Sequence, residues 1–434
     1  MIEKRDNIQS ERAFLVGAYS REDEDDPDLA LDELASLVEA AGGLAVGRAF
    51  QRRSAGQRVQ AATYIGRGKA EHVAQLAEAH EANVIVFDAE LSPAQIRELE
   101  KIFERRTIDR SELILDIFAS RARTKEARSQ VELAQLQYTA PRLRGMWTHL
   151  ERQAGQGAGM LGGRGPGEKQ IEIDRRLVTK RITLLRNELK SLHARKQREV
   201  EGRINRGYCV GLVGYTNAGK STLMNKLTDA DTYVADQLFA TLDTRTRRWQ
   251  LGTGAPVLLS DTVGFVSRLP HQLVASFRAT LEEALHADLL LHVIDASHPQ
   301  ALEQIATVER VLKELDCEMG RIVPVLNKVD VADPDALITL RGRLGNTVAV
   351  SARTGEGIED LETIVSQRRS ADWSVATIRA SAGNGRVQAF AHTHAVLRSD
   401  KFEDDIWVAE IELPRAKLGT LRGMLGADDA LNIL

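Results

Sequence analysis

The chain has 434 residues, and at about 150 residues per domain this length predicts roughly three domains. Apolar residues make up 43% and charged residues 28%, a balance that is typical of globular proteins and excludes fibrous and disordered classes. The N-terminus lacks the apolar core of a signal peptide, and no run of about 18 apolar residues occurs. We therefore expect a cytoplasmic, monomeric protein without membrane insertion.

The net charge of −4 is distributed unevenly along the chain. Residues 121–206 contain 20 Lys and Arg against 9 Asp and Glu, a net charge of +11, whereas the remainder carries −15. A basic stretch in an acidic protein is typical of binding to a phosphate-rich partner. A solvated helical segment, kept soluble by its charges, is the alternative interpretation.

Residues 1–110 alternate short apolar runs with amphipathic segments. Strands are predicted at 13–19 and 83–87, and apolar residues have helical spacing over 29–41 and 93–103. This pattern predicts an N-terminal α/β domain.

Residues 111–206 are predicted to form a basic helical hairpin with a glycine-rich tip at 155–168. Seven glycines lie between Gly155 and Gly167. Trp147, just before the tip, is interpreted as a packed side chain rather than as a platform for a nucleic-acid base. After the tip, apolar residues recur at the spacings of a helix–helix seam. These residues are Ile171, Val178, Ile182, Leu185, Leu189 and Leu192.

A third domain, of alternating strands and helices, is predicted over residues 207–370. Apolar runs at 208–213, 289–295 and 322–330 are typical of buried parallel strands. The predicted fold class is therefore multidomain α/β, with a doubly wound, mostly parallel sheet in this domain. The rest of the chain, 371–434, is predicted to be a small α+β domain.

Two strands and a helix are predicted in the C-terminal domain. The strands are assigned to RVQAFAHTHA, residues 386–395, and to DIWVAEIELP, residues 405–414, and the helix follows from about Arg415. No motif with a chemical function is recognised among them.

The segment GYTNAGKS, residues 214–221, matches the phosphate-binding pattern GxxxxGK[ST] between a predicted strand and a predicted helix. In such loops the backbone N–H groups face the phosphates at the positive end of the helix. Lys220 is expected to contact the β- and γ-phosphates, and the Ser221 hydroxyl is expected to bind Mg²⁺. The loop alone does not distinguish ATP from GTP. The predicted phosphate-binding residues are Gly214, Tyr215, Thr216, Asn217, Ala218, Gly219, Lys220, Ser221 and Thr222.

The motif NKVD, residues 327–330, predicts which base is bound, because it ends an apolar strand where doubly wound folds bind ligands. The Asp330 carboxylate can accept from N1–H and the 2-amino group of guanine, a donor pair that adenine lacks. Bound adenine would leave this carboxylate buried and unpaired. Asn327 is expected to brace the loop, and the Lys328 stem is expected to cover the base.

The tripeptide Ser351, Ala352 and Arg353 follows the predicted strand TVAV. It is expected to complete the base pocket with backbone N–H groups that face O6 of guanine. Its order and spacing after NKVD support this assignment, since a tripeptide alone is not specific.

A γ-phosphate contact is predicted in DTVG, which follows the strand PVLLS. Asp261 is expected to reach Mg²⁺ through a water, and the Gly264 N–H is expected to reach the γ-phosphate. The members of the motif are Asp261, Thr262, Val263 and Gly264.

Between these motifs, a loop must supply a threonine to Mg²⁺ and the γ-phosphate. Thr241 is chosen for this role over Thr244. The loop residues assigned to the nucleotide site are Phe239, Ala240, Thr241, Leu242 and Asp243. Lys220, Thr241 and Gly264 are the predicted catalytic residues.

The order GYTNAGKS, FATLD, DTVGF, NKVD and SAR resembles the five nucleotide motifs of the translation-factor-related GTPases. Together with the upstream segment RGPGEKQIEIDRR, it resembles the HflX family of the Obg–HflX branch over nearly the whole chain. The resemblance implies a Mg²⁺-dependent GTPase that forms GDP and phosphate. It also implies binding to the large ribosomal subunit, stimulation by it, and splitting or rescue of stalled 70S ribosomes under stress.

Similar proteins also hydrolyse ATP and remodel RNA through their N-terminal part, so an RNA-remodelling nucleotidase that uses ATP is the alternative function. Residues 1–110 contain no GxxxxGK[ST] match. Their nearest phosphate-like loop is IGRGK, residues 65–69, which is interpreted as an ordinary turn.

Phe265 follows DTVG at the position where Ras-like proteins have a glutamine that orients the attacking water. Phenylalanine has no hydrogen-bonding group, so slow intrinsic hydrolysis is predicted. Related GTPases use a partner, or K⁺ held by the P-loop asparagine, which here is Asn217. A role of Asn217 in bracing the loop is the alternative.

Contacts to ribosomal RNA are predicted for arginines of the hairpin. Neutralisation of phosphates would supply much of the affinity and make it depend on salt. These arginines are Arg164, Arg175, Arg176 and Arg181.

Overall fold

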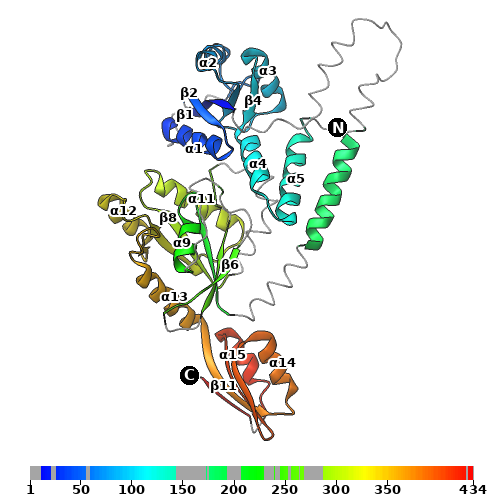
Figure 1. The fold of residues 1–434 in the computed structure, drawn as a ribbon, viewed down its shortest axis with the longest axis vertical. Helices are drawn as coiled ribbons and strands as arrows, with labels where there is room; N and C mark the ends of the chain where they lie inside the picture. Colours follow the sequence, from blue (N-terminus) through cyan, green and yellow to red (C-terminus); the bar gives the residue numbers. More distant parts are fainter. Residues whose placement is uncertain are drawn as a thin grey trace. The chain divides into compact units, whose positions relative to one another are not determined.

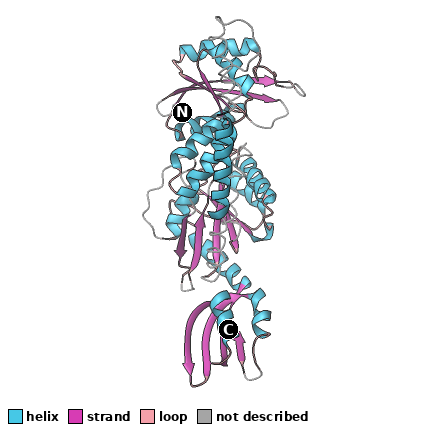
Figure 2. Ribbon diagram, turned by 90° about the vertical axis from the view of Figure 1, so that its right-hand side faces the viewer, coloured by secondary structure: helices cyan, strands magenta, loops and turns pink. Residues whose placement is uncertain are grey.

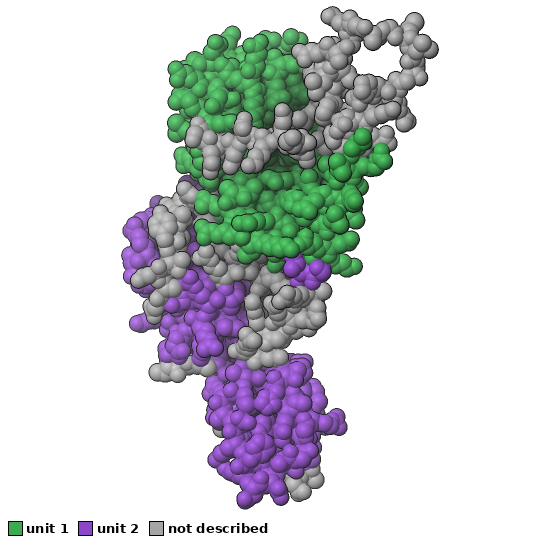
Figure 3. Space-filling model, turned by 45° about the vertical axis from the view of Figure 1, so that its right-hand side comes forward, with its two compact units in different colours: residues 1–190, 236–242, 268–277 green, residues 191–235, 243–267, 278–434 purple. Residues whose placement is uncertain are grey.

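The fold is multidomain α/β, and its described residues divide into two compact units (Figures 1 and 3). Unit 1 contains the described residues up to 190 together with Phe239, and unit 2 contains the others. The computed structural model describes residues 11–20, 26–54, 59–142, 173, 175–192, 207–228, 239, 245–252, 256–262, 264–267, 287–426 and 429–433.

Unit 1 begins with a four-stranded parallel sheet in the order β2-β1-β3-β4. Its strands are β1 (Arg12–Ser20), β2 (Leu44–Arg53), β3 (Val84–Phe87) and β4 (Arg106–Asp109). The connecting helices are α1 (Pro27–Ala40), α2 (Arg67–Ala79) and α3 (Pro93–Phe103). The two predicted strands and two predicted helices are confirmed as β1, β3, α1 and α3. The prediction missed β2, an edge strand that buries little of its length and therefore lacks a strong apolar pattern.

The start of α3 illustrates how local sequence sets these boundaries. The Ser92 side chain accepts from the Gln95 N–H, the Gln95 side chain accepts from the Ser92 N–H, and Pro93 occupies the first helical turn. Such reciprocal capping satisfies N–H groups that have no partner within the helix. The helix ends at Phe103, and the next residue, Glu104, has a left-handed backbone.

The predicted helical hairpin is present as α5 (Lys125–Thr139) and a helix over residues 175–192, with α4 (Arg110–Arg121) beside α5. Arg181 donates two hydrogen bonds to Glu132, of 2.6 and 2.7 Å, and Lys125 Nζ lies 2.6 Å from Glu188 Oε1. Because later residues of one helix meet earlier residues of the other, the two helices are antiparallel. Val178 and Leu185 of the predicted seam are buried. The tip at 155–168, with Trp147 and Ile171, lies outside the described residues.

Unit 2 contains a six-stranded sheet in the order β10-β9-β8-β5-β7-β6. The strands are β5 (Cys209–Gly214), β6 (Arg245–Trp249), β7 (Val257–Asp261), β8 (Leu289–Asp295), β9 (Ile322–Asn327) and β10 (Val348–Ala349). All neighbours are parallel except β6, which pairs antiparallel with β7. The mostly parallel sheet is therefore confirmed.

Helices cover both faces of this sheet. They are α9 (Lys220–Leu227), α11 (Ala301–Glu314), α12 (Pro334–Leu344) and α13 (Ile358–Asp372), with a 3-10 turn at Met319–Arg321. Successive strand residues point to opposite faces. Thus Val293 packs in the cluster with α9 and α13, whereas Ile294 packs in the cluster with α11 and α12. The domain is doubly wound, as predicted.

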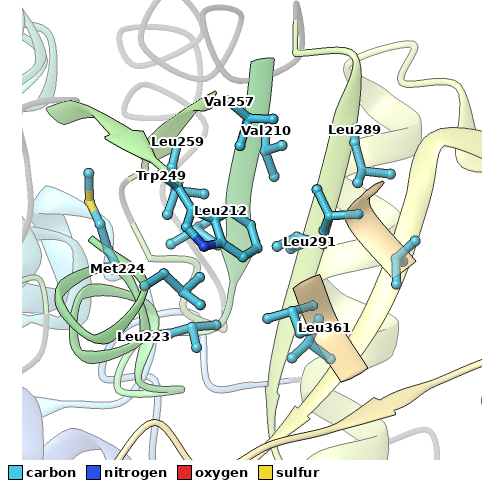
Figure 4. Close-up of a cluster of buried hydrophobic side chains, with 14 of the residues drawn as sticks. Val210, Leu212, Leu223, Met224, Trp249, Val257, Leu259, Leu289, Leu291 and Leu361 are labelled. Carbon is cyan, nitrogen blue, oxygen red and sulfur yellow. The ribbon is translucent and has the colours of Figure 1, made fainter. Parts of the chain in front are cut away.

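Around Trp249, side chains from β5, β6, β7, β8, α9 and α13 form one apolar core (Figure 4). Leu212, Leu223 and Leu291 belong to the same buried cluster as Trp249. Burial of such a side chain contributes about 1.5–3 kcal/mol. This core fixes the carboxyl ends of the parallel strands, where the predicted site residues lie.

The C-terminal part of unit 2 is α+β, as predicted, with a four-stranded antiparallel sheet in the order β12-β13-β11-β14 (Figure 2). The strands are β11 (Trp373–Ser381), β12 (Val396–Glu403), β13 (Ile406–Pro414) and β14 (Ala430–Ile433), and the helices are α14 (Gly385–His394) and α15 (Arg415–Arg422). DIWVAEIELP is confirmed as β13, and α15 begins at the predicted Arg415.

The strand predicted at RVQAFAHTHA is wrong, because this segment forms α14. The Asn384 side chain caps it by accepting from the Val387 N–H. Val387, Phe390 and Ala391 are buried together, a spacing that fits one face of a helix and not one side of a strand. None of the described helices is long and apolar enough to span a membrane.

Candidate nucleotide-binding site

The loop from Gly214 to Gly219 joins β5 to α9, and two of its glycines are sterically required. Both have positive φ, +151° at Gly214 and +89° at Gly219. A Cβ at Gly214 would lie 2.2 Å from the Val293 carbonyl oxygen, and one at Gly219 would lie 2.2 Å from Asn327 Nδ2. Only glycine combines this backbone with such close approach.

Lys220 folds back over this loop. Its Nζ donates to the carbonyl oxygens of Gly214 (3.0 Å) and Tyr215 (2.7 Å), and the residue is 6% exposed. Burial lowers the pKa of Lys220 to about 8, against the opposing effect of Asp261. A buried ammonium at the N-terminus of a helix is suited to an anionic ligand, which would supply the charge that burial lacks.

Ser221 and Asp261 bring two oxygen ligands together. Ser221 Oγ donates to Asp261 Oδ2 at 2.6 Å, and Asp261 is buried at the end of β7. A hydroxyl beside a carboxylate fits Mg²⁺, which prefers oxygen ligands and keeps several waters. Thr241, the second predicted direct ligand, lies outside the described residues, as do Ala240, Leu242, Asp243, Thr244 and Val263.

Asn327 connects three of the predicted motifs. Its Nδ2 donates to the Ala218 carbonyl oxygen (2.8 Å), and its Oδ1 accepts from the Ala352 N–H (3.0 Å). The P-loop, NKVD and SAR therefore meet at one buried amide. This arrangement matches the bracing role predicted for Asn327.

Asp330 lies beside SAR, where the base is predicted to bind. A hydrogen bond from Ser351 and the positive charge of Arg353 both lower the pKa of Asp330. Arg353 Nη2 lies 2.7 Å from Asp330 Oδ2. The carboxylate is thus ionised at neutral pH and can accept from two donors of a base.

Sequence reasoning missed Asp295 as a member of this pocket. Lys328 Nζ donates to Asp295 Oδ2 at 2.6 Å, and Ser297 donates to Asp295 Oδ1 through its N–H (3.0 Å) and Oγ (2.6 Å). Asp295 therefore sets the direction of the Lys328 stem. Its position at the carboxyl end of the buried strand β8 is the signal that could have indicated it.

Other predicted residues are placed differently. Phe239 is grouped with unit 1, where its ring packs at 4.6 Å on Phe118 of α4 and is 2% exposed. The Phe239 ring is therefore used for packing. Thr222 is exposed in the first turn of α9. The segment IGRGK opens α2 and is not only a turn, and its Gly66 N–H donates to Gln51 Oε1 (2.9 Å).

The arginines predicted to contact RNA also differ from one another. Arg175 and Arg176 are exposed, whereas Arg181 is paired with Glu132 across the hairpin. Arg181 therefore contributes to helix pairing, which the sequence pattern did not show. Arg164 lies outside the described residues.

A phosphate loop at a helix N-terminus, a hydroxyl–carboxylate pair and a carboxylate at the base position define a guanine-nucleotide-binding P-loop GTPase. Family models match residues 28–119 (GTP-binding GTPase N-terminal), 121–203 (GTP-binding GTPase Middle Region) and 209–328 (50S ribosome-binding GTPase). Two curated relatives named GTPase HflX, from Lacrimispora saccharolytica and Escherichia coli K12, are each 43% identical. They align over 92% and 91% of this chain, and over the same shares of their own lengths. The chain belongs to the HflX family of GTPases.

Among solved structures, a GTP-binding protein from Sulfolobus solfataricus in complex with GDP is similar to this chain. The two are 23% identical with a TM-score of 0.41, and the match covers 83% of this chain and 99% of that one.

Proposed function

We propose that this GTPase binds the large ribosomal subunit and splits or rescues stalled 70S ribosomes under stress, in the cytoplasm. The match of residues 209–328 to a model described as 50S ribosome-binding GTPase carries the proposal. The +11 charge of residues 121–206 supports an RNA partner. Hydrolysis of GTP would then time release from the subunit.

Mg²⁺ is proposed to bind Ser221 and Thr241 directly and Asp261 through a water. The 2.6 Å contact between Ser221 and Asp261 supports this assignment. When bound, the ion would neutralise charge that develops on the phosphates during transfer. Lys220 would contact the same phosphates from the P-loop side.

Slow hydrolysis by the free protein is proposed because Phe265 is 1% exposed and has no group that could orient water. The ribosome, or K⁺ held by Asn217, would complete the site. Turnover should therefore rise when large subunits are added. Equal turnover with and without subunits would contradict this.

The sharpest test uses the base. Asp330→Asn places an amide donor where guanine needs an acceptor. The variant should therefore lose its affinity for GTP and bind xanthosine triphosphate instead. Sedimentation with 70S ribosomes should show splitting by the variant with xanthosine triphosphate and none with GTP. If the variant binds GTP normally, the base pocket is wrongly assigned; if it binds xanthosine triphosphate without splitting ribosomes, the ribosomal role is wrong.

The hairpin arginines allow a matched comparison. Arg175→Ala and Arg176→Ala should each weaken ribosome binding and reduce its salt slope by up to about one if the residue contacts a phosphate. Arg181→Ala should leave the salt slope near that of the parent, since this guanidinium is engaged with Glu132. A parental salt slope for both Arg175→Ala and Arg176→Ala would contradict the proposed RNA contact of these two residues.

The second candidate is an ATP-driven RNA-remodelling activity of the N-terminal part. It is favoured by one observation: IGRGK opens α2, and a helix between parallel strands begins at the carboxyl edge of the sheet, where ligands bind. ATP hydrolysis by full-length Lys220→Ala tests it, since this variant lacks the GTPase lysine. Loss of all ATP hydrolysis would exclude a second site.

A further inference from the structure

The segment after β7 is held at both ends. At its start, Thr262 Oγ1 donates to the Leu212 carbonyl oxygen at 2.7 Å. At its end, the Ser267 N–H donates to the Tyr215 hydroxyl at 2.6 Å. The first anchor belongs to the sheet, and the second is a side chain of the phosphate loop.

Between these anchors the segment pairs with the P-loop backbone. The Thr216 N–H donates to the Phe265 carbonyl oxygen (2.6 Å), and the Phe265 N–H donates to the Gly214 carbonyl oxygen (3.1 Å). These bonds form a parallel bridge between Tyr215 and Phe265. They bring the segment onto the loop that binds the phosphates.

Gly264 is consequently pressed against the phosphate site. A Cβ on Gly264 would lie 2.8 Å from Thr216 Cγ2 and 3.0 Å from Lys220 Nζ. This contact places the Gly264 backbone beside the lysine that is expected to bind the γ-phosphate. Any residue could form the backbone bridge, but the bond to Ser267 needs the hydroxyl of Tyr215.

We propose that Tyr215 is a positioning residue whose hydroxyl holds the segment from Gly264 to Ser267 on the P-loop and thereby makes the site select GTP over GDP. The proposal rests on the assignment of the Gly264 N–H to the γ-phosphate. GDP lacks this phosphate, so a displaced Gly264 weakens GTP binding alone. Tyr215 is 7% exposed, and phenylalanine would keep the packing of its ring while removing the hydroxyl that accepts from Ser267.

The test measures the affinities of full-length Tyr215→Phe for GDP and for a non-hydrolysable GTP analogue by calorimetry. Affinity for the analogue should fall about 3- to 10-fold, the usual worth of one buried hydrogen bond, and GDP affinity should not change. Tyr208→Phe is the matched control. Tyr208 is also buried in unit 2, but its hydroxyl donates to Asp372 (3.0 Å), so its loss should leave the ratio of the two affinities unchanged.

Three results would overturn the proposal: parental affinities for both nucleotides, an equal loss for both, or a gain for the GTP analogue. Gly264→Ala separates this failure from failure of the site, because the added methyl group meets Thr216 and Lys220 and should lower analogue affinity selectively. If it does not, the γ-phosphate assignment itself is wrong. Should Tyr215→Phe fail to fold, Ser267→Pro removes the same bond from the donor side and must show the same selective loss.

Discussion

Two groups of buried charges, one in each unit, lie at the carboxyl ends of parallel strands and differ in what surrounds them. In unit 1, Asp109 ends β4 and is 0% exposed. Its carboxylate accepts from Arg142 Nη2 (2.9 Å), the Tyr138 hydroxyl (2.7 Å) and the N–H groups of Leu91 (3.0 Å) and Glu112 (2.8 Å). Four donors fill the acceptor sites of this carboxylate.

The pKa values in the Asp109 cluster show the cost of such burial. Burial raises the pKa of Asp109, although Arg142 and the hydrogen bonds oppose this. Burial and the nearby carboxylates also raise the pKa of Tyr138. The cluster holds α5 against the sheet, and the polar groups of Asp109, Tyr138 and Arg142 form hydrogen bonds with one another.

In the GTPase site, by contrast, the described residues offer the ammonium group of Lys220 two carbonyl oxygens for its three donors. Asp261 accepts from the Ser221 hydroxyl (2.6 Å) and from the Thr262 N–H (2.9 Å), and the oxygen atoms of Ser221 and Asp261 are of the kind that Mg²⁺ prefers. The comparison teaches that buried charge at a strand end is not sufficient evidence of a ligand site. The donor capacity that remains on Lys220 makes the difference.

The largest effect is expected when this capacity is removed. Lys220→Ala should reduce GTP hydrolysis by about 10³-fold or more, since one preorganised charge on the transferred phosphate is lost. The thermal transition should remain, because burial of the charged lysine does not stabilise the folded domain. Turnover assays and thermal unfolding of the same preparation test this, and loss of the transition would show that Lys220 supports the fold instead.

Asp109→Asn should have the opposite pattern. It leaves Arg142 buried beside a neutral amide and should lower the free energy of unfolding by about 3–5 kcal/mol, while GTP affinity stays unchanged. Denaturant unfolding measures the first and calorimetry the second. Asp32→Asn is the control, because its exposed pair with Arg48 (2.7 Å) should contribute at most about 1 kcal/mol. Equal losses in the two variants would contradict the comparison.

The GTPase core should also show a pH dependence of its own. Burial, with a smaller effect of Lys220, lowers the pKa of His292 to about 4 from 6.5. The unfolded chain therefore binds the proton first, so this stability is complete above pH 6.5 and is lost as the pH falls towards 4. The parent should lose about 3 kcal/mol more than His292→Gln over this range. Parallel stability curves for the two proteins would show that His292 does not titrate there.

The smallest effect concerns Asn217, which has a left-handed backbone (φ 59°) in the P-loop. If it holds K⁺, exchange of K⁺ for Na⁺ at constant ionic strength should slow hydrolysis by the parent and not by Asn217→Ala. Phosphate release in the two salts measures this. A parent that is indifferent to the salt would leave Asn217 only the role of bracing the loop.

Much of the GTPase domain was predictable from sequence because its signals are local. The strands at 289–295 and 322–327 are near-continuous apolar runs, and the P-loop is a contiguous motif that can be recognised without knowledge of the contacts with Val293 and Asn327 that require its glycines. The assignment of RVQAFAHTHA failed because alternation and helical spacing are hard to separate in ten residues. The segment forms a helix because Asn384 caps its start and its apolar side chains are buried against β13.

Contacts between distant segments were decided only by the tertiary structure. The sequence indicated that NKVD, SAR and the P-loop belong to one site, but not that Asn327 bonds to both Ala218 and Ala352. Likewise, nothing local shows that Asp295 orients Lys328, or that Tyr215 reaches Ser267 across 52 positions of the chain. A sequence motif indicates which chemical groups are present, because the side chains are covalent parts of the chain. The direction of a side chain and its partner depend on which strands become neighbours, and that is settled when the sheet and its core form.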